Sequence, residues 1–547
     1  MRFAALAATL ALAAGVRIAN LASARSDAYL AWRVGDEQHF HDWALRIAHG
    51  ELGRGATFFT TPLYAYVLAV AYRVGGDDLG WIRLLNVALG VAAVALTYLA
   101  ARHALAPWPS VVAALVVGGC LAPVFYESLP EKTSLVFFLT ALALWAIARA
   151  GSRRRPSAWV LAGASVGLAA LAHALLVVLV PCAWFDIVVR GRHDRRRALA
   201  ALAAFTGAAA LAVAPATLHN YLADGELVAI ASNGGHNFYL GNHAGNLTGR
   251  YTSPPFSTSN LAEEEAGFRR EAERRTGRTL GAAAVSAFWY RQGWRDVLSV
   301  PGTSLARFAR KAWWAVSDEE ITDSRTFSFY RARMPVLALP LPTFGAVAVI
   351  GLLGFFLAGR DRRLLVHRAF VVALVVVLAL FLVTGRYRLP LLVPFAILGA
   401  AMLARYVDAA RHGRLRDLAV AAVAGAGIAW MIFGRVPAAV PESFFVDYYN
   451  QGNQYLRQGR YDLAAAEYEQ ALWVRPGNHA AIPLLVDGLA DLYERLGRRA
   501  DAERLLTRAI ARDPDNAAYR AALERLRAAA GPIRSRPGSP DTRGSDR

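Results

Sequence analysis

The sequence predicts an all-α protein in which a polytopic membrane domain is followed by a small α-solenoid tail. Of its 547 residues, 56% are hydrophobic and 18% are charged, which is more apolar than an ordinary soluble protein. The apolar residues gather into runs of roughly 17 to 25 residues, the length with which a helix crosses a hydrocarbon core. After the last run the sequence becomes polar and repeats itself. We therefore expect a membrane domain over residues 1–435 and a repeat domain over residues 442–530.

About eleven transmembrane helices are expected, one for each long apolar run. A further apolar stretch, residues 61–74, is too short to span a bilayer, so we expect a juxtamembrane or re-entrant helix there. The expected spans are residues 3–21, 81–105, 109–126, 133–149, 158–172, 174–189, 198–218, 336–357, 369–384, 389–404 and 417–433.

The arginines predict the side of the membrane on which each loop lies. Short basic loops stay in the cytoplasm, which puts the N-terminus in the cytoplasm of what we expect to be a bacterial inner membrane. The repeat tail and the long loops, residues 22–80 and 219–335, then lie on the extracytoplasmic side. The basic loops are residues 149–155, 190–197, 360–363 and 405–416.

The net charge of +19 does not indicate a nucleic-acid partner. The arginines lie in these loops rather than on one basic, aromatic-rich face. Within the second long loop, residues 304–316 place apolar side chains on one helical face and Arg307, Arg310 and Lys311 on the other. Such a helix is expected to lie in the membrane interface.

The tail contains two copies of a tetratricopeptide-like pattern, spaced by 38 residues. Small residues in such repeats let two antiparallel helices approach closely. Residues 516–529 are expected to form a capping helix, and residues 531–547 to be disordered. The repeats suggest a protein partner or an acceptor held by the tail. Matched positions are Gly452, Tyr455, Gly459 and Ala464 in one copy and Ala490, Tyr493, Gly497 and Ala502 in the other.

Two adjacent acids, Asp36 and Glu37, follow the first expected span. Acids are common in outer loops, so a solvated loop is one interpretation. Further along come a Pro-Leu-Tyr segment, an Arg-Leu-Leu-Asn segment that opens the second span, an asparagine-rich loop motif and a late arginine-proline turn. The residues are Pro62-Leu63-Tyr64, Arg83-Leu84-Leu85-Asn86, Asn233 to Asn242 and Gly385 to Pro390.

This order of motifs resembles family 39 of the membrane glycosyltransferases with the GT-C fold. The family includes protein O-mannosyltransferases and the aminoarabinose transferase that modifies lipid A. The resemblance implies an inverting transfer of a sugar from a polyprenyl-phosphate donor, a membrane lipid, to a protein, lipid or glycan acceptor at the outer face. It implies no cofactor, and a divalent metal stays open. One departure is Phe40, where the family is expected to carry an aromatic hydroxyl.

Asp36 is the candidate general base. An attacking hydroxyl or amine must lose its proton, and a carboxylate in a partly desolvated pocket has its pKa raised towards working pH. Glu37 is the second candidate catalytic residue, which orients Asp36 or a substrate hydroxyl. Adjacent acids titrate as a pair, so the two roles are interchangeable at this point.

Arg386 and Arg388 are the candidate cations for the donor phosphate, whose charge grows in the transition state. Their alternative role is that of interfacial anchors. Glu131 and Lys132 form either a substrate-binding pair or a mutually neutralising one. The remaining candidate substrate contacts are His173, for which a structural role is the alternative, Asn237 and Asn242.

No His and carboxylate cluster has the spacing of a metal site. One rival function is an O-antigen ligase or polymerase-like transferase, which would place catalytic basic residues in the loop 219–335. Another is a non-catalytic scaffold or transporter. Transport is disfavoured because no chain of ionisable residues crosses the middle of the spans.

Overall fold

The computed structural model describes residues 2–25, 27–53, 55–153, 155–257, 261–323, 325–434, 444–474 and 482–528. Every regular element in these ranges is a helix. The chain divides into two compact units, Met1–Ala439 and Val440–Arg547. Residues 435–442, between the two expected domains, and the expected disordered tail at 531–547 lie outside the described residues.

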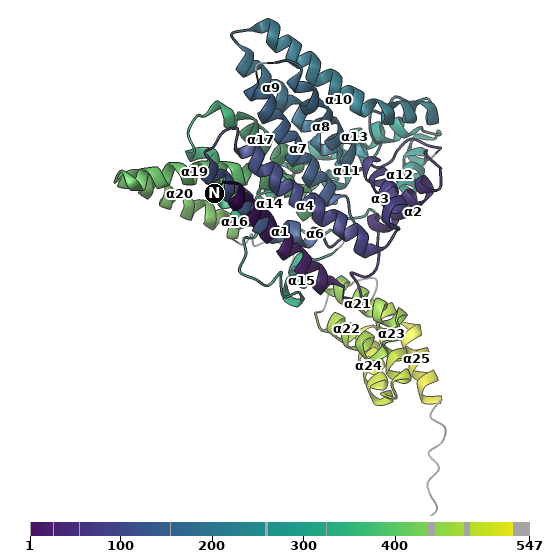
Figure 1. Ribbon diagram of the computed structural model, residues 1–547. Coiled ribbons are helices and arrows are strands. Elements are labelled where there is room, and N and C mark those ends of the chain that lie inside the picture. Colours follow the sequence, from purple (N-terminus) through teal and green to yellow (C-terminus); the bar gives the residue numbers. More distant parts are fainter. Residues whose placement is uncertain are drawn as a thin grey trace, which may run out of the picture. The chain divides into compact units, whose positions relative to one another are not determined.

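Eight helical segments in the described ranges are long and apolar enough to cross a membrane, and all eight fall on expected spans. The chain is therefore a multi-pass membrane protein. These segments pack together as the bundle of the first unit (Figure 1). They contain α1 (Arg2–Ala24), α4 (Leu79–Ala101), α7 (Thr133–Ser152), η1 with α9 (Ala174–Gly191), α10 (Arg195–Asp224), η2 with α17 (Arg362–Leu380), α18 to α19 (Gly385–Arg411) and α20 (Leu415–Phe433).

The other three expected spans are shorter helices than the sequence predicted. Residues 109–126 are divided at Cys120, whose extended backbone separates α5 (Pro107–Gly119) from α6 (Leu121–Tyr126). The span expected at 336 begins only at α16 (Phe344–Leu357), because Pro340 and Pro342 keep the preceding chain out of a helix. The third is α8 (Ala158–Ala172). Eight segments, rather than about eleven, thus meet the length of a full span.

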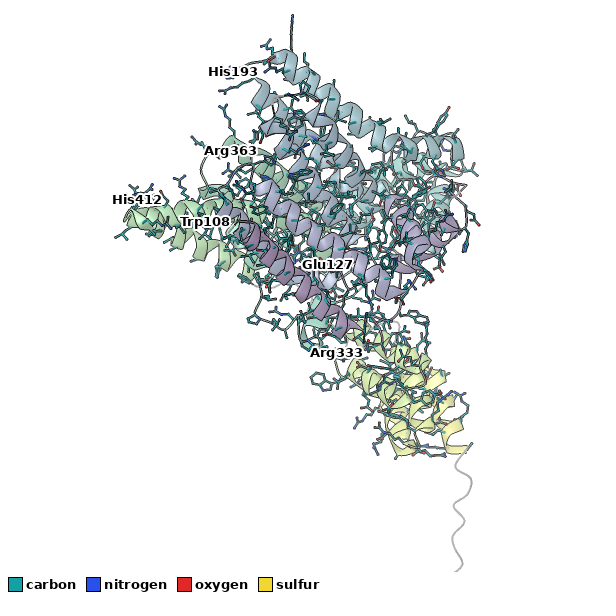
Figure 2. All side chains as sticks on the ribbon, viewed as in Figure 1. Trp108, Glu127, His193, Arg333, Arg363 and His412 are labelled. Carbon is teal, nitrogen blue, oxygen red and sulfur yellow. The ribbon has the colours of Figure 1, made fainter. Side chains whose placement is uncertain are left out.

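Several of the turns between these helices can be located from labelled residues. In Figure 2, Trp108, His193, Arg363 and His412 lie along one edge of the membrane unit, and Glu127 lies away from that edge. The N-terminus is on the same edge as the first group (Figure 1). The basic turns that contain His193, Arg363 and His412 therefore lie along one edge of the membrane unit.

Close packing of α8 on α10 depends on glycine. A Cβ atom at Gly163 would lie 2.1 Å from the carbonyl oxygen of Phe205, and one at Gly167 would lie 2.7 Å from that of Ala209. Small residues spaced by four positions let helix backbones approach in a membrane, where hydrophobic burial does not drive association. This pair of helices therefore packs by backbone contact rather than by large side chains.

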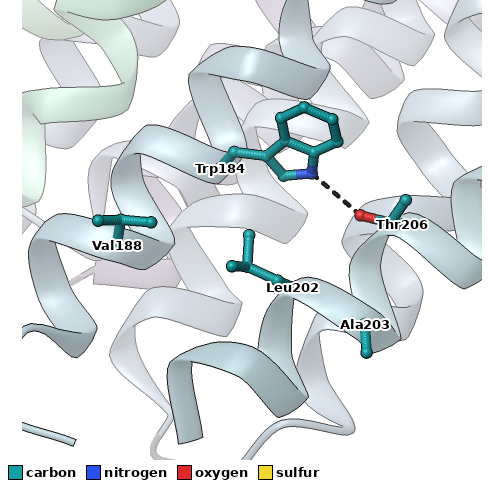
Figure 3. Close-up of a pocket in the computed structure, with 5 residues that line it drawn as sticks. All are labelled: Trp184, Val188, Leu202, Ala203 and Thr206. Carbon is teal, nitrogen blue, oxygen red and sulfur yellow. Dashed lines mark hydrogen bonds between the residues drawn. The ribbon is translucent and has the colours of Figure 1, made fainter. Parts of the chain in front are cut away.

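Another part of α10 borders an apolar pocket of ≈ 440 Å³ together with α9 (Figure 3). Trp184 donates from its indole nitrogen to the hydroxyl of Thr206 across a distance of 3.0 Å. Val188 and Leu202 complete an apolar wall. A surface of this composition suits lipid chains.

Both long loops are folded. The first contains α2 (Asp36–Ala48) and α3 (Leu63–Gly75), which is the short helix expected near residues 61–74. The second contains α11 (Gly234–Asn242), α12 (Leu261–Thr276), α13 (Ala282–Ser299), α14 (Pro301–Trp314) and α15 (Phe327–Arg333). Tyr239, Phe268 and Trp289 form an aromatic core of this segment.

The basic face of α14 is turned into the protein. Arg307 donates to the carbonyl oxygens of His243 and Asn246 at 2.8 and 2.7 Å, and Lys311 is fully buried. Leu305, on the opposite face, is 69% exposed. The amphipathic pattern therefore packs its polar side on the outer segment and leaves its apolar side outward.

The second unit consists of antiparallel helix pairs. They are α21 (Phe445–Arg457), α22 (Tyr461–Trp473), α23 (Ile482–Arg495), α24 (Arg499–Arg512) and α25 (Ala517–Ala528). Gly459 and Gly497 both have φ of 71°, so equivalent turns join the helices of each copy. Tyr519 and Leu526 of α25 are buried in the shared core, as expected of a capping helix.

Gly163→Ala tests the backbone packing of α8 on α10. Because the new methyl group collides with the carbonyl oxygen of Phe205, we expect a loss of about 1–3 kcal/mol of stability, measured by thermal unfolding in detergent. Gly207→Ala is the matched control. No atom lies within 4 Å of its Cβ position, so unfolding should not occur at a lower temperature. Equal unfolding temperatures for the two variants would contradict this account.

Candidate active site

Asp36 and Glu37 form the first turn of α2, where carboxylates are favoured by the helix dipole. Successive residues of an α-helix are rotated by about 100°, so the two side chains point in different directions. Asp36 is 32% exposed and pairs with Arg386, whereas Glu37 is completely buried and pairs with Arg325. The adjacent acids therefore belong to two different ion-pair clusters.

Arg386 is the centre of the first cluster. Its two terminal nitrogens lie 2.9 Å from Asp36 Oδ2 and 3.3 Å from Glu131 Oε2, and its Nε lies 2.5 Å from Asp323 Oδ2. Only 8% of the arginine side chain is exposed. Three carboxylates from three separate segments thus surround one nearly buried guanidinium.

The turn that carries Arg386 is tightly packed. A Cβ at Gly385 would lie 2.2 Å from the hydroxyl oxygen of Tyr126, and the backbone N–H of Gly385 donates to the carbonyl of Ile321 at 2.9 Å. Thr384 caps the turn by accepting from the N–H of Tyr387. This packing holds α18 (Gly385–Arg388) beside the segment that carries Asp323.

The second cluster anchors that same segment. Arg325 pairs with Glu37 where both side chains are fully buried, and it also donates to the carbonyl oxygens of Tyr29 and Trp32 at 3.3 and 2.8 Å. Glu37 accepts in addition from the N–H of Val34 at 3.1 Å. A buried charge is tolerated when it is paired and hydrogen-bonded in this way. The pair therefore connects the start of α2 to the chain around Asp323.

The two exposed acids of the first cluster titrate differently. Burial raises the pKa of Asp36, but Arg386 and Lys132 outweigh it, so the net pKa is lowered. Burial also raises the pKa of Asp323, and Arg386 opposes this only in part, because the carboxylates of Asp36 and Glu131 add to the rise. Asp36 is thus the more readily ionised member of the pair, and the raised pKa that the sequence led us to expect for Asp36 is not found.

Lys132 supplies a second cation beside the cluster. Its ammonium donates to the hydroxyl of Thr61 at 3.2 Å and lies 5.5 Å from the centre of the Phe40 ring. Burial lowers the pKa of Lys132 to about 8, against the opposing effect of Asp36. Phe40, the departure from the family pattern, therefore faces a cation with its ring in place of a hydroxyl.

His173 lies next to the cluster. Its ring centre is 4.7 Å from that of Tyr387, and its Nδ1 accepts from the N–H of Leu175 at 3.3 Å. Burial lowers the pKa of His173 well below its usual range, and Lys132 and Arg386 lower it further. The imidazole is therefore neutral at physiological pH.

The remaining predicted residues occupy other places. Arg388 is fully buried, donates to the carbonyls of Trp314 and Ser317 at 2.8 and 2.7 Å and lies 3.0 Å from Glu320. Asn242 donates to the carbonyls of Phe238 and Leu380 and accepts from Lys311 at 3.1 Å. Asn237 is half-buried on α11. The structure therefore gathers Asp36, Glu131, Lys132, His173 and Arg386, and holds Arg388 and Asn242 in backbone contacts.

The Arg-Leu-Leu-Asn segment contacts the turn that carries Glu131 and Lys132. Arg83 donates to the carbonyl of Ser128 at 2.8 Å, and Asn86 donates to that of Leu129 at 2.8 Å. These bonds hold the turn between α6 and α7, from which Glu131 and Lys132 project. The segment thus acts on the turn rather than on a substrate.

Asp323 and Arg325 were missed from the sequence. Asp323 ends an acid-rich run of the outer segment, Asp318-Glu319-Glu320-Ile321-Thr322-Asp323, and Arg325 follows two residues later. The density of acids in this run was the available signal. Nothing local indicated that the run would meet α2, because the contacting residues Glu37 and Arg325 are 288 positions apart.

Comparison with known families places part of the chain. Residues 60–219 match the family described as dolichyl-phosphate-mannose-protein mannosyltransferase, and residues 455–526 match the tetratricopeptide repeat. The resemblance to this class of transferase that the sequence predicted is thereby confirmed over residues 60–219, and the repeat over residues 455–526. No curated protein sequence matches the chain.

Two solved structures share weak similarity with the chain. The oligosaccharyltransferase AglB from Archaeoglobus fulgidus, in complex with an inhibitory peptide and a dolichol-phosphate, is 14% identical with a TM-score of 0.44. The match covers 87% of this chain but only 60% of that one. ArnT from Cupriavidus metallidurans, bound to undecaprenyl phosphate, is 16% identical with a TM-score of 0.35, over 74% of this chain and 79% of that one. Both scores are low, so the assignment rests on the family match.

Glu37→Ala tests whether the buried pair holds the site together. Removing one partner leaves Arg325 charged and buried, so we expect a loss of about 3 kcal/mol or more of stability, measured by unfolding in detergent. The control is Glu51→Ala, which removes an exposed partner of Arg46 at 4.0 Å and should change little. An unfolding curve for Glu37→Ala that overlays the wild type would show that the pair is not needed.

Proposed function

We propose that the chain is an inverting glycosyltransferase that moves a sugar from a polyprenyl phosphate to an acceptor on the extracytoplasmic side. The observation that carries this proposal is the convergence of Asp36, Glu131 and Asp323 on Arg386. The family match over residues 60–219 supports the reaction class. A scaffold or a transporter has no need of such a cluster away from the arginine-rich turns.

Asp36 acts as the general base. Its carboxylate is the most exposed of the three around Arg386, at 32% against 24% for Asp323 and 2% for Glu131. An acceptor oxygen or nitrogen forms a bond to the anomeric carbon as the bond from that carbon to the phosphate oxygen breaks. The acceptor proton passes to Asp36 and the phosphate leaves on its lipid.

Lys132 and Arg386 stabilise the charge that grows on the departing phosphate. An ammonium has three donors, and the Thr61 hydroxyl takes one of those of Lys132. Arg386 pairs with three carboxylates. Its positive charge therefore reduces the repulsion between these carboxylates and the donor phosphate. We assign Arg388 and Glu37 to positioning, because both are fully buried in contacts with the protein.

The repeats hold a protein partner or the acceptor itself. The loop charges support our proposal that the active site and the tail lie on the extracytoplasmic side of a bacterial inner membrane. Stacked helix pairs present an extended surface that suits a peptide or a protein. The tail is therefore assigned to delivery of the acceptor.

Asp36→Asn tests the base. With purified full-length protein and a panel of polyprenyl-phosphate sugars, we expect donor consumption to fall roughly 100-fold or more. Asp42→Asn is the matched control, because Asp42 lies on the exposed face of the same helix and accepts a hydrogen bond from Gln38 at 2.7 Å. It should retain activity. Equal donor consumption by Asp36→Asn and the wild type would remove Asp36 from this role.

The pH dependence distinguishes the two acids. If Asp36 is the base, its lowered pKa keeps kcat/KM constant down to a pH below the ordinary aspartate range. Lys132→Met removes a charge that lowers this pKa, so the acid limb should move to higher pH. Lys132→Arg keeps the charge and should leave the limb in place. A wild-type limb above the ordinary aspartate range would point to Asp323, whose pKa is raised.

A further inference from the structure

A polar cavity lies away from the carboxylate cluster, at the ends of four membrane helices. It has a volume of ≈ 730 Å³ and is bordered by α16, α17, α19 and α20. Four arginines and a single acid line it. These residues are Arg360, Arg368, Arg405, Arg416 and Asp417.

One of these arginines is used by the fold. Arg368 donates from Nε to the carbonyl of Phe355 at 3.1 Å and from a terminal nitrogen to that of Gly359. It therefore satisfies the carbonyl oxygens at the end of α16. Its charge remains in the cavity wall, because neutral carbonyl groups do not cancel it.

The other three arginines have no carboxylate partner among the residues that the structure describes. Arg405 folds back towards the chain, with Nη1 2.9 Å from the position of a Cβ on Gly359. Neighbouring arginines outside the cavity are paired: Arg363 with Asp361 at 2.7 Å, and Arg414 with Asp408. The unpaired guanidinium groups thus collect in one hollow.

The cavity also has an apolar border. Phe356 is 68% exposed and Val420 is 50% exposed, and both line it. Each belongs to a helix of the membrane unit, where an exposed apolar side chain suits contact with lipid. A hollow that joins fixed cations to an apolar wall matches a phosphate group with a hydrocarbon tail better than it matches a free anion.

Basic residues in short loops usually serve topology alone. Here arginines from three helices, α17, α19 and α20, and from the loop after α16 line one cavity. Arg363 and His412, which mark the turns beside it, lie on the edge that also carries the N-terminus (Figures 1 and 2). Basic pockets between helices on the cytoplasmic side bind anionic lipid head groups.

We propose that this cavity binds the head group of an anionic phospholipid from the cytoplasmic leaflet. The guanidinium groups of Arg360, Arg405 and Arg416 contact the phosphate oxygens, for which their planar donor pairs are suited. Phe356 and Val420 contact the glycerol and the upper acyl chain. The site is separate from the proposed transfer reaction and does not depend on it.

Native mass spectrometry of the full-length protein in detergent tests the site. Phosphatidylglycerol is titrated against the wild type, against Arg405→Gln with Arg416→Gln, and against Arg195→Gln with Arg196→Gln. The last pair is the matched control, since Arg195 and Arg196 are exposed arginines of a basic loop outside the cavity. We expect the Kd of the tightest bound lipid to rise about tenfold in the cavity variant and to stay unchanged in the control. Arg416→Gln alone, at an exposed side chain, should show a smaller rise.

Three results would overturn the proposal. The first is an equal loss in the cavity and control variants, which would reduce the effect to general surface charge. The second is equal binding of zwitterionic phosphatidylcholine. The third is displacement of the lipid by inorganic phosphate, which would make the cavity a site for a free anion.

Discussion

The arrangement of the outer face depends on one guanidinium. Arg386 pairs with Asp36 and Glu131, which are 350 and 255 positions away in the chain, and with Asp323. A buried cation without partners is strongly unfavourable, so these three segments are held together wherever Arg386 is buried. The first loop, the turn between α6 and α7, and the outer segment therefore meet at a single point. The carboxylate cluster therefore forms around the buried charge of Arg386, which needs carboxylate partners.

Arginine has a second, structural use in this protein. Arg17 donates to the carbonyl of Gly118 at 2.8 Å, and Arg83, Arg307 and Arg388 likewise donate to carbonyls of distant segments. A guanidinium carries five donors in a rigid plane, so one side chain satisfies several carbonyl groups at the broken ends of helices. Arg83 and Arg388, which belong to motifs that resemble functional ones, therefore contact the backbone around the site and not the carboxylate cluster. Arginine thus serves both in the carboxylate cluster and in the backbone contacts that hold the surrounding segments.

The two polar regions of the membrane unit are electrostatically opposite. The cluster around Arg386 has an excess of carboxylates, whereas the cavity between α16, α17, α19 and α20 has an excess of guanidinium groups. Positive loops set the orientation of the helices in the membrane. Two of these loops, residues 360–363 and 405–416, contribute arginines to the cavity that we propose binds a lipid phosphate.

The membrane class, eight of the expected spans, the short helix at 61–74 and the repeats were all predictable from the sequence. These follow from hydrophobic length and from periodic small residues, which are local properties. It also singled out Asp36, Glu131, Lys132 and Arg386. Three features became visible only in the folded chain: Glu37 pairs with the buried Arg325, Arg388 and Asn242 donate to backbone carbonyls, and Asp323 joins the cluster. The physical reason is that a charge pair between distant residues leaves no periodic trace in the chain. Such pairs form between whichever carboxylate and buried cation lie close together once the helices have packed.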